Sequence, residues 1–269
     1  DVIHATNSPP SQVTAARTAA RVLRVPVVVD WWAVREGDTA RMIRRAARTP
    51  DRVLAPSQLV KTAVRERGAR ADDVTVVPDF IDIDLVRSAD VDNRADLVYA
   101  RRLDEHANVE SFLLALAELR DREWRAVVVG DGPERGHAME TAAELRIDDR
   151  VSFLGALSPA EFVPILKGAH VFAQTAAVEP FARELLWALA CGCVGIVEYQ
   201  AASSAHELVE NCQRGARVTD PQELADEVVA AAGHDRVSFN ETVAGYDHTH
   251  VLDTYERVYE DERDARGFF

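Results

Sequence analysis

The sequence predicts an α/β protein with two domains, each built on a parallel β-sheet covered by helices. Two observations lead to this fold class. Short apolar runs such as Val27-Val28-Val29 alternate with segments whose apolar residues recur at helical spacing, which is typical of buried parallel strands joined by helices. The alternation stops at residues 78–93, where a Pro-Asp turn and a polar stretch without apolar periodicity indicate a domain boundary. A chain of 269 residues has room for two such domains.

The first domain is assigned to residues 1–92. Strands are expected at residues 1–5, 26–29, 51–55 and 74–77, and helices at residues 13–23, 41–48 and 58–67. The last of these helices has the clearest ends, because Ser57 is a favoured N-cap residue and Gly68 a favoured stop.

The second domain is assigned to residues 93–245. Strands are expected at residues 96–100, 125–129, 151–154, 171–173, 195–197 and 216–218, and helices at residues 109–119, 133–145, 159–166, 180–191, 205–209 and 221–232. After this domain, the segment at residues 251–260 is amphipathic and predicts a final helix.

Composition limits the function and the location. The net charge of −14 argues against binding to nucleic acid. Only Lys61 and Lys167 among the 31 basic residues are lysines, which is typical of a halophile-like acidic protein and equally of a GC-rich genome. No apolar run approaches the ~20 residues of a membrane helix. We therefore expect no integral membrane segment and a cytoplasmic location, either free or at a membrane surface.

The segment at residues 171–199 carries the strongest functional signal. It combines a buried strand, a turn with Glu179 and Pro180, a helix and a second strand. Pro180 is expected at the first helical position, where proline and acidic residues are favoured. Because helix amides at the carboxyl edge of a parallel sheet face the ligand, this arrangement favours an anion-binding site.

The same segment resembles the signature of the GT-B glycosyltransferases, specifically the large retaining family often called family 4. That signature is Glu-Pro-Phe-Gly, a second Glu in the helix, and Ala-Cys-Gly. In this chain it stands as Glu179-Pro180-Phe181-Ala182, with Trp187 in place of the second Glu, and Ala190-Cys191-Gly192. The resemblance covers nearly the whole chain.

The resemblance implies a GT-B architecture, in which two Rossmann-like domains face each other across a cleft. Asp1 opens the chain inside a strand pattern, so the first domain is expected to be truncated at its N-terminus and to be joined by the C-terminal helix at residues 246–269. The implied reaction moves a sugar from a nucleotide-sugar donor to an acceptor hydroxyl of a glycan, a lipid or a small molecule, with retention. The nucleotide-sugar is a substrate, so the resemblance implies no cofactor and no bound metal.

Several donor-site residues follow from the resemblance. Glu179 is the catalytic candidate, which hydrogen-bonds hydroxyls of the donor sugar, and the amides of Phe181 and Ala182 lie near it. Glu184 lies one turn before Trp187 and is the nearest replacement for the second Glu.

A second segment resembles the family's Gly-Arg-Leu…Lys-Asn motif, whose Arg and Lys bind the donor diphosphate. Arg102 matches the Arg, whereas Arg101 replaces the Gly and Ala107 replaces the Lys. Arg101 and His106 are the cations that remain nearby. The turn with Gly130 and Gly132 also opens a helix after a strand, and it reads either as a phosphate loop or as a plain turn.

Residues on the acceptor side come from the first domain. His4 and Thr6 align with a His-x-His segment beside the reacting sugar, with Thr6 in place of the second His. Trp32 occupies a position that is often His.

Four departures from the family, at Thr6, Trp32, Ala107 and Trp187, all fall on polar contacts. They leave two hypotheses open, a divergent active transferase and a catalytically lapsed binding or partner subunit. A nucleotide-sugar epimerase of the same fold has no support beyond the architecture.

Overall fold

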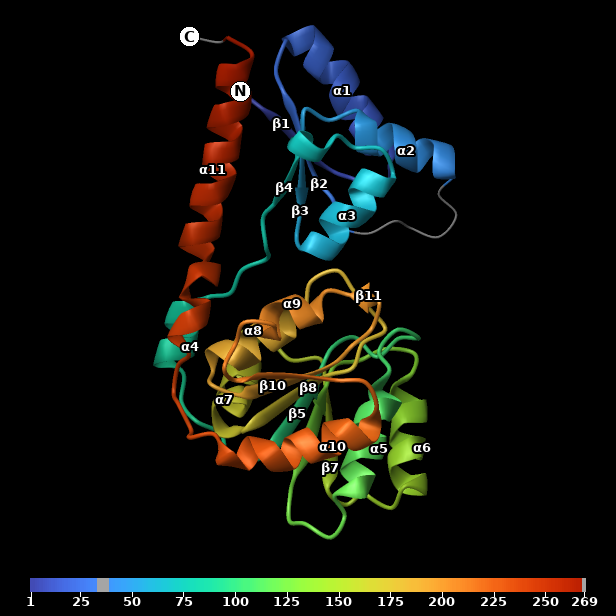
Figure 1. The fold of residues 1–269 in the computed structure, drawn as a ribbon, viewed down its shortest axis with the longest axis vertical. Coiled ribbons are helices and arrows are strands. Elements are labelled where there is room, and N and C mark those ends of the chain that lie inside the picture. The colour runs from blue at the N-terminus through green and yellow to red at the C-terminus, as the bar shows by residue number, and fades with distance from the viewer. Residues whose placement is uncertain (33–38, 268–269) are drawn as a thin grey trace. The chain divides into compact units, whose positions relative to one another are not determined.

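The computed structural model describes residues 1–32 and 39–267, which divide into two compact units (Figure 1). Unit 1 comprises Asp1–Phe80 and His248–Phe269, and unit 2 comprises Ile81–Asp247. Each unit contains its own parallel sheet, as expected from the sequence.

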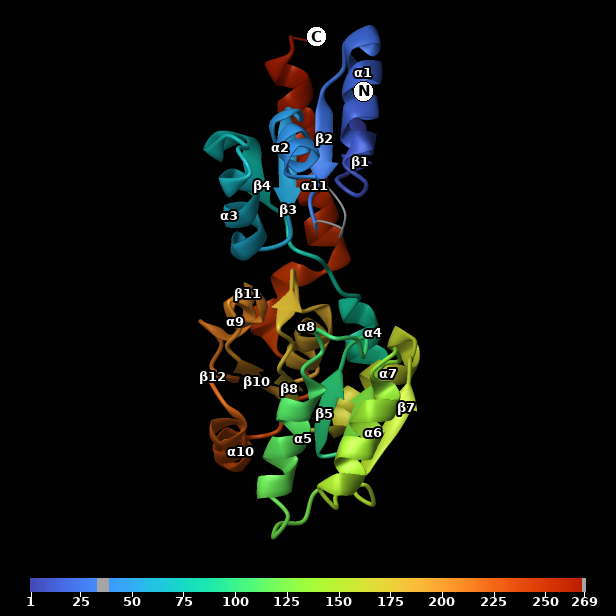
Figure 2. The same cartoon turned by 90° about the vertical axis from the view of Figure 1, so that its right-hand side faces the viewer.

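The sheet of unit 1 follows the chain order. Its strands are β1 (Ile3–Thr6), β2 (Val27–Asp30), β3 (Arg52–Ala55) and β4 (Val74–Val76), and they lie side by side as β1-β2-β3-β4 (Figure 2). Helices α1 (Ser11–Leu23), α2 (Ala40–Arg48) and α3 (Gln58–Glu66) cover one face, a 3₁₀ turn lies at Ala71–Asp73, and α11 (His248–Ala265) covers the other face (Figure 1).

Strand β2 shows why a run of valines forms a strand here. Val27 and Val29 pack in the core beneath α1–α3, whereas Val28 points to the opposite core, which contains Val251 and Val258 of α11. A strand buried on both faces needs apolar residues at every position.

The sheet of unit 2 has the strand order β12-β10-β8-β5-β6-β7 (Figure 2). The strands are β5 (Leu97–Ala100), β6 (Ala126–Val129), β7 (Val151–Gly155), β8 (Val171–Gln174), β10 (Val194–Glu198) and β12 (Gly215–Val218). The chain builds from β5 to one edge, returns beside β5 as β8, and builds to the other edge. The order therefore reverses between β5 and β8, and ligands of doubly wound sheets bind at the carboxyl side of such a switch point.

Helices cover both faces of this sheet (Figure 1). One face packs against α4 (Ile83–Ser88), α7 (Pro159–Gly168), α8 (Arg183–Ala190) and α9 (Ala205–Val209), and the other against α5 (Val109–Glu118), α6 (Arg135–Glu144) and α10 (Pro221–Ala230). A small sheet of β9 (Val178–Glu179) and β11 (Ala202–Ser203) and 3₁₀ turns at Ala231–Gly233 and Glu241–Tyr246 complete the unit. No helix among the described residues has both the length and the apolar character of a membrane span.

Two features differ from the sequence expectation. Residues 81–92, which were assigned to the first domain, pack in unit 2, because the unexpected helix α4 places Ile83 and Val86 in the core beside α7 and α8. Pro180 does not begin a helix. Glu179 lies in β9, and α8 begins at Arg183, because Ser204 pairs with the extended backbone of 179–180 through its amide and its hydroxyl.

Candidate functional site

The turns after β5 and β8 meet at the switch point of unit 2. They bring the side chains of Arg101 and Glu179 together, with Nη1 of Arg101 3.6 Å from Oε2 of Glu179. The two side chains are only 11% and 14% exposed, respectively. A cation and a carboxylate therefore share a partly enclosed position at the edge of the sheet where ligands bind.

Backbone carbonyls fix the guanidinium of Arg101. Its Nε donates to the carbonyl of Arg102 at 3.2 Å, and Nη1 donates to the carbonyls of His106 and Val178 at 3.2 and 3.1 Å. Nη2 lies 3.5 Å from the carboxylate of Asp104. Because the acceptors belong to both turns, Arg101 ties the two turns together.

Burial raises the pKa of Glu179 to about 7. The charge of Arg101 and a hydrogen bond from the amide of Phe181 oppose this effect, whereas the carboxylates of Glu184 and Asp104 add to it. Glu179 therefore changes its charge near neutral pH, which suits a group that accepts hydrogen bonds or exchanges a proton.

The side chain of Arg102 does not join the Arg101–Glu179 pair, although the sequence motif matched Arg102 to the diphosphate-binding arginine. Its side chain is 72% exposed, and its nearest charged partner is Asp104 at 3.9 Å. The structure thus brings Glu179 together with Arg101, the residue at the motif's Gly position. The sequence showed that Arg101 directly follows a strand. It did not show that Arg101 is buried, because that burial depends on the turn that contains Val178.

Ala107, which replaces the family's Lys, belongs to the core. Its side chain packs with Tyr99 and Phe112, and its carbonyl accepts the hydroxyl hydrogen of Tyr99 at 2.7 Å. The side chain of the neighbouring His106 is half exposed and lies 3.8 Å from the carboxylate of Glu105.

Gly130 and Gly132 lie against the turn after β5. A Cβ atom on Gly130 would stand 1.8 Å from the carbonyl oxygen of Arg101, and one on Gly132 would stand 2.2 Å from that of Leu103. Both glycines have positive φ angles, +131° and +157°. Close packing of the two backbones thus requires glycine at both positions, and the loop that contains these glycines packs directly against the backbone of Arg101.

The start of α8 supplies the remaining donor-side candidates. Phe181 and Ala182 are buried immediately before the helix, and Phe181 lies 6.3 Å from the ring of Tyr246. Glu184 is half-buried near Glu179. Trp187 is 7% exposed and packs in the core between α8 and its neighbours, so no carboxylate stands at that position.

The acceptor-side candidates lie on β1 and just after β2 in unit 1. Nδ1 of His4 lies 2.6 Å from the hydroxyl of Tyr259, and its Nε2 lies 3.3 Å from Asp30. Thr6 donates to the side chain of Gln12 at 2.9 Å. Trp32 is 37% exposed, and its amide donates to Asn7. His4 is thus held by α11 and by Asp30, and Trp32 is partly exposed.

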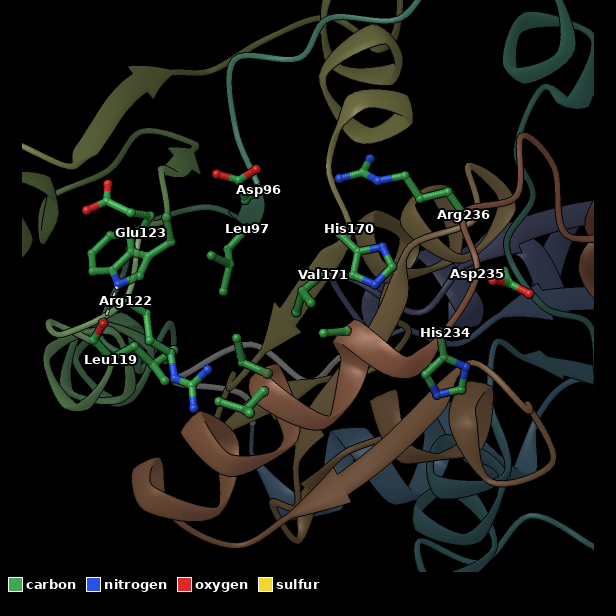
Figure 3. Close-up of a pocket in the computed structure, with 14 residues that line it drawn as sticks. Asp96, Leu97, Leu119, Arg122, Glu123, His170, Val171, His234, Asp235 and Arg236 are labelled. Atoms are coloured by element: carbon green, nitrogen blue, oxygen red, sulfur yellow. Dashed lines mark hydrogen bonds between the residues drawn. The ribbon is translucent and has the colours of Figure 1, made fainter.

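Two cavities of about 520 Å³ each lie at opposite edges of the unit 2 sheet. The one at the carboxyl edge is lined by Ala107, Asn108 and His137 together with acidic residues, among them Asp104, Glu110, Glu134 and Glu198. The other lies at the amino edge, where His170 and Val171 stand between Leu119 on one side and Arg236 on the other (Figure 3). It contains no residue that the sequence assigns to the donor site.

The described residues contain no group of three or more His, Cys, Asp or Glu side chains that could hold a metal ion. At the switch point lie the charged pair of Arg101 and Glu179, the carbonyls that accept from Arg101 and the amide of Phe181.

Comparisons with known proteins cover both units. Residues 82–235 match the family model described as glycosyl transferases group 1, and residues 1–79 match that of a glycosyl transferase 4-like domain. The alpha-monoglucosyldiacylglycerol synthase of Streptococcus pneumoniae is 24% identical over 168 residues, which are 56% of this chain and 38% of that protein. The lipopolysaccharide 1,6-galactosyltransferase of Salmonella typhimurium is 28% identical over 216 residues, which are 77% of this chain and 57% of that protein. The chain thus spans about two fifths of the length of the first of these curated relatives and just over half of the length of the second.

Solved structures share the fold. Anabaena Alr3699/HepE in complex with UDP superposes with a TM-score of 0.82 at 21% identity, over 97% of this chain and 79% of that one. Sucrose-phosphate synthase from Thermosynechococcus elongatus gives a TM-score of 0.78 at 17% identity, over 98% and 74%. These similarities confirm the predicted GT-B fold class.

Proposed function

Because the chain belongs to the glycosyl transferases group 1 family, we propose that it transfers a sugar from a nucleotide-sugar donor to an acceptor hydroxyl, with retention of the anomeric configuration. The observation that carries the proposal is the pairing of Arg101 with Glu179 at the carboxyl edge of the unit 2 sheet. In this function the donor binds at the switch point, where a carboxylate accepts hydroxyl hydrogens of the sugar and cations balance the diphosphate.

The roles follow from the residues present. Glu179 accepts hydrogen bonds from the sugar, Arg101 holds a positive charge beside Glu179, and the exposed Arg102 on the same turn is the cation assigned to the diphosphate. The remaining donor-side candidates are Phe181, Ala182, Glu184, Trp187, Gly130 and Gly132. His4, Thr6 and Trp32 are assigned to the acceptor side.

The donor class can be tested directly. Anabaena HepE has been solved with UDP and with UDP-glucose, so UDP-sugars come first, followed by GDP- and ADP-sugars. A thermal-shift panel on the wild type should show a rise in Tm with one nucleotide class. Glu179→Gln should reduce that rise, whereas Glu140→Gln, an exposed change on α6, should not. A panel without any shift contradicts the proposal.

A second candidate function is a catalytically lapsed binding or partner subunit. Trp187 favours it, because a buried indole stands where the family has a carboxylate. The two candidates separate in turnover. A nucleotide-sugar that binds and is consumed in the presence of an acceptor identifies an enzyme, and one that binds without consumption identifies the lapsed subunit.

We further propose a lipid-borne acceptor and peripheral association with an anionic membrane. The two curated relatives are named for a diacylglycerol glycolipid and for lipopolysaccharide. In a chain of net charge −14, α2 carries four arginines and no acidic residue in nine positions. At the end of α1, on the same face of unit 1, Val22 and Leu23 are 80% and 63% exposed. Exposed apolar side chains beside arginines favour an anionic bilayer surface.

Vesicle binding tests this association. The wild type should sediment with vesicles that contain phosphatidylglycerol at low salt and should be released at high salt. Replacing Arg44, Arg45 and Arg48 by Gln should abolish sedimentation, while Arg257→Gln with Arg263→Gln on α11 should leave it unchanged. Equal sedimentation of all three proteins contradicts the assignment of this face.

A further inference from the structure

We infer that Arg101, which stands at the glycine position of the family motif, is a positioning residue for Glu179. The inference rests on the function proposed above, because it concerns how the carboxylate is presented to a donor. It differs from the sequence prediction, which gave the cationic role in this motif to Arg102.

The guanidinium of Arg101 is held rigidly. The guanidinium of Arg101 donates to three backbone carbonyls, those of Arg102, His106 and Val178. Backbone acceptors on two turns leave little freedom for a planar fork of donors. The charge therefore occupies a fixed position before any ligand arrives, which is the condition for preorganised binding.

The guanidinium of Arg101 also lies beside Glu179. The same Nη1 atom that bonds to the carbonyl of Val178 lies 3.6 Å from the carboxylate of the next residue, Glu179. The backbone of this segment is held in turn by its pairing with β11. A separation of 3.6 Å is too long for a hydrogen bond, so Arg101 acts on Glu179 through its charge and leaves the carboxylate oxygens free to accept other donors.

The charges around the Glu179 carboxylate are unbalanced without Arg101. Asp104 from the turn after β5 and Glu184 from α8 both disfavour ionised Glu179, and burial does so more strongly. Arg101 is the cation that opposes them, together with the amide of Phe181. Without Arg101, two carboxylates and a low dielectric would surround Glu179, which would then hold its proton at neutral pH.

The lysine of the family motif is replaced in this chain by Ala107. Position 107 is a buried alanine, which supplies no cation. Arg102 is largely exposed and contacts Asp104. Among these three positions, only Arg101 places a positive charge beside Glu179.

The test measures the ionisation of Glu179 without any ligand. The full chain is labelled with ¹³C at the side-chain carboxyls of Glu, the signal of Glu179 is assigned through Glu179→Gln, and its midpoint is followed by NMR. We expect a midpoint of about 7 in the wild type. Arg101→Met should raise it by roughly 1 unit or more, because an opposite charge at this distance is lost. Arg101→Lys should restore most of the difference, and Arg217→Met, an exposed change on β12, should leave the midpoint unchanged.

Donor binding supplies the second readout. A midpoint near 8 would reduce the ionised fraction of Glu179 at pH 7 from about a half to about a tenth. Arg101→Met should therefore weaken nucleotide-sugar binding about fivefold at pH 7, and the defect should shrink toward pH 9. If Arg101 only held the two turns together, Arg101→Met would weaken nucleotide-sugar binding by the same factor at every pH.

The outcomes separate the inference from the proposed function. A folded Arg101→Met protein with an unchanged midpoint overturns the positioning role, whatever the protein binds. If that variant does not fold, Arg101→Gln, which keeps an amide donor for the carbonyls, takes its place with the same expected rise. A wild type that binds no UDP-, GDP- or ADP-sugar overturns the proposed function and the donor role of the pair, even where the NMR shift is seen.

Discussion

The carbonyl oxygen of Arg101 occupies the space where a side chain of Gly130 would begin, 1.8 Å from the ideal Cβ position. The turn after β5 thus rests directly on the turn after β6. Since the amide of Leu103 also donates to the carbonyl of Asp131 at 3.0 Å, the two turns form one packed layer under the Arg101–Glu179 pair.

This contact predicts a large cost for Gly130→Ala. The substitution forces the backbone of the two turns apart and places a Cβ atom at a φ of +131°. We expect the free energy of unfolding to fall by ~3 kcal/mol or more. Gly136→Ala is the matched control, because nothing lies within 4 Å of its Cβ position in α6, and it should be neutral or stabilising by up to ~1 kcal/mol. Urea unfolding of both variants measures the difference, and equal stabilities would contradict the packing argument.

The raised pKa of Glu179 predicts a dependence of stability on pH. The folded state keeps its proton up to about pH 7, whereas the unfolded state releases it near the ordinary value of 4.5. Between these values the folded state binds more protons, so this group lowers the free energy of unfolding as the pH rises, by up to ~3 kcal/mol. Glu179→Gln removes the contribution, and it should therefore gain stability relative to the wild type between pH 5 and pH 8. Urea unfolding across this range checks the sign, and a constant difference would mean that the pKa is not raised.

The strands of both sheets were predictable because their signal is local. Runs such as Val27–Asp30 are apolar at every position, and only a strand buried on both faces uses such a pattern. Helix α4 was missed because six residues with Ile83 and Val86 as the buried pair carry too little periodicity, although Asp82 caps the helix through the amide of Leu85.

The site was only partly predictable because its geometry depends on distant residues. Glu179 was proposed because Glu179-Pro180-Phe181-Ala182 resembles the family signature. The start of α8 was misplaced because Ser204, 24 residues after Pro180, holds the backbone extended. Arg101 and Arg102 are adjacent in sequence, and the carbonyl of Val178, which belongs to another turn, anchors the first of them. No local pattern reveals such a contact.

The burial of Trp187 determines what we expect when the family's glutamate is restored at this position. The indole is 7% exposed in the core beside Leu185, Leu186 and Phe181. Trp187→Glu leaves a cavity and brings a carboxylate into apolar surroundings, so we expect it to lower the free energy of unfolding by ~3–5 kcal/mol. Trp187→Phe, which keeps the site apolar, should cost less than half as much.

Calorimetric titration with nucleotide-sugars completes this test. If Trp187→Glu stays folded and binds the donor more tightly than the wild type, the indole occupies space that the ribose needs, which supports the lapsed subunit. Weaker binding by the variant supports an active site that uses the ring.

The last prediction concerns the attachment of α11 within unit 1. Oε1 of Glu262 lies 2.7 Å from both Nε and Nη2 of Arg52 on β3, and the Glu262 side chain is only 10% exposed. Val251 and Val258 pack on the sheet together with Tyr255 and Tyr259, and the ion pair of Glu262 adds a polar attachment near the end of the helix. Glu262→Gln should lower the free energy of unfolding of unit 1 by about 1–3 kcal/mol, because charge-assisted hydrogen bonds are lost and a half-buried guanidinium stays behind. Glu260→Gln, on the exposed side of the same helix, should change it by less than about 0.5 kcal/mol. Hydrogen exchange at the amides of α11 measures the effect locally, and equal protection in the two variants would show that the apolar contacts alone hold the helix.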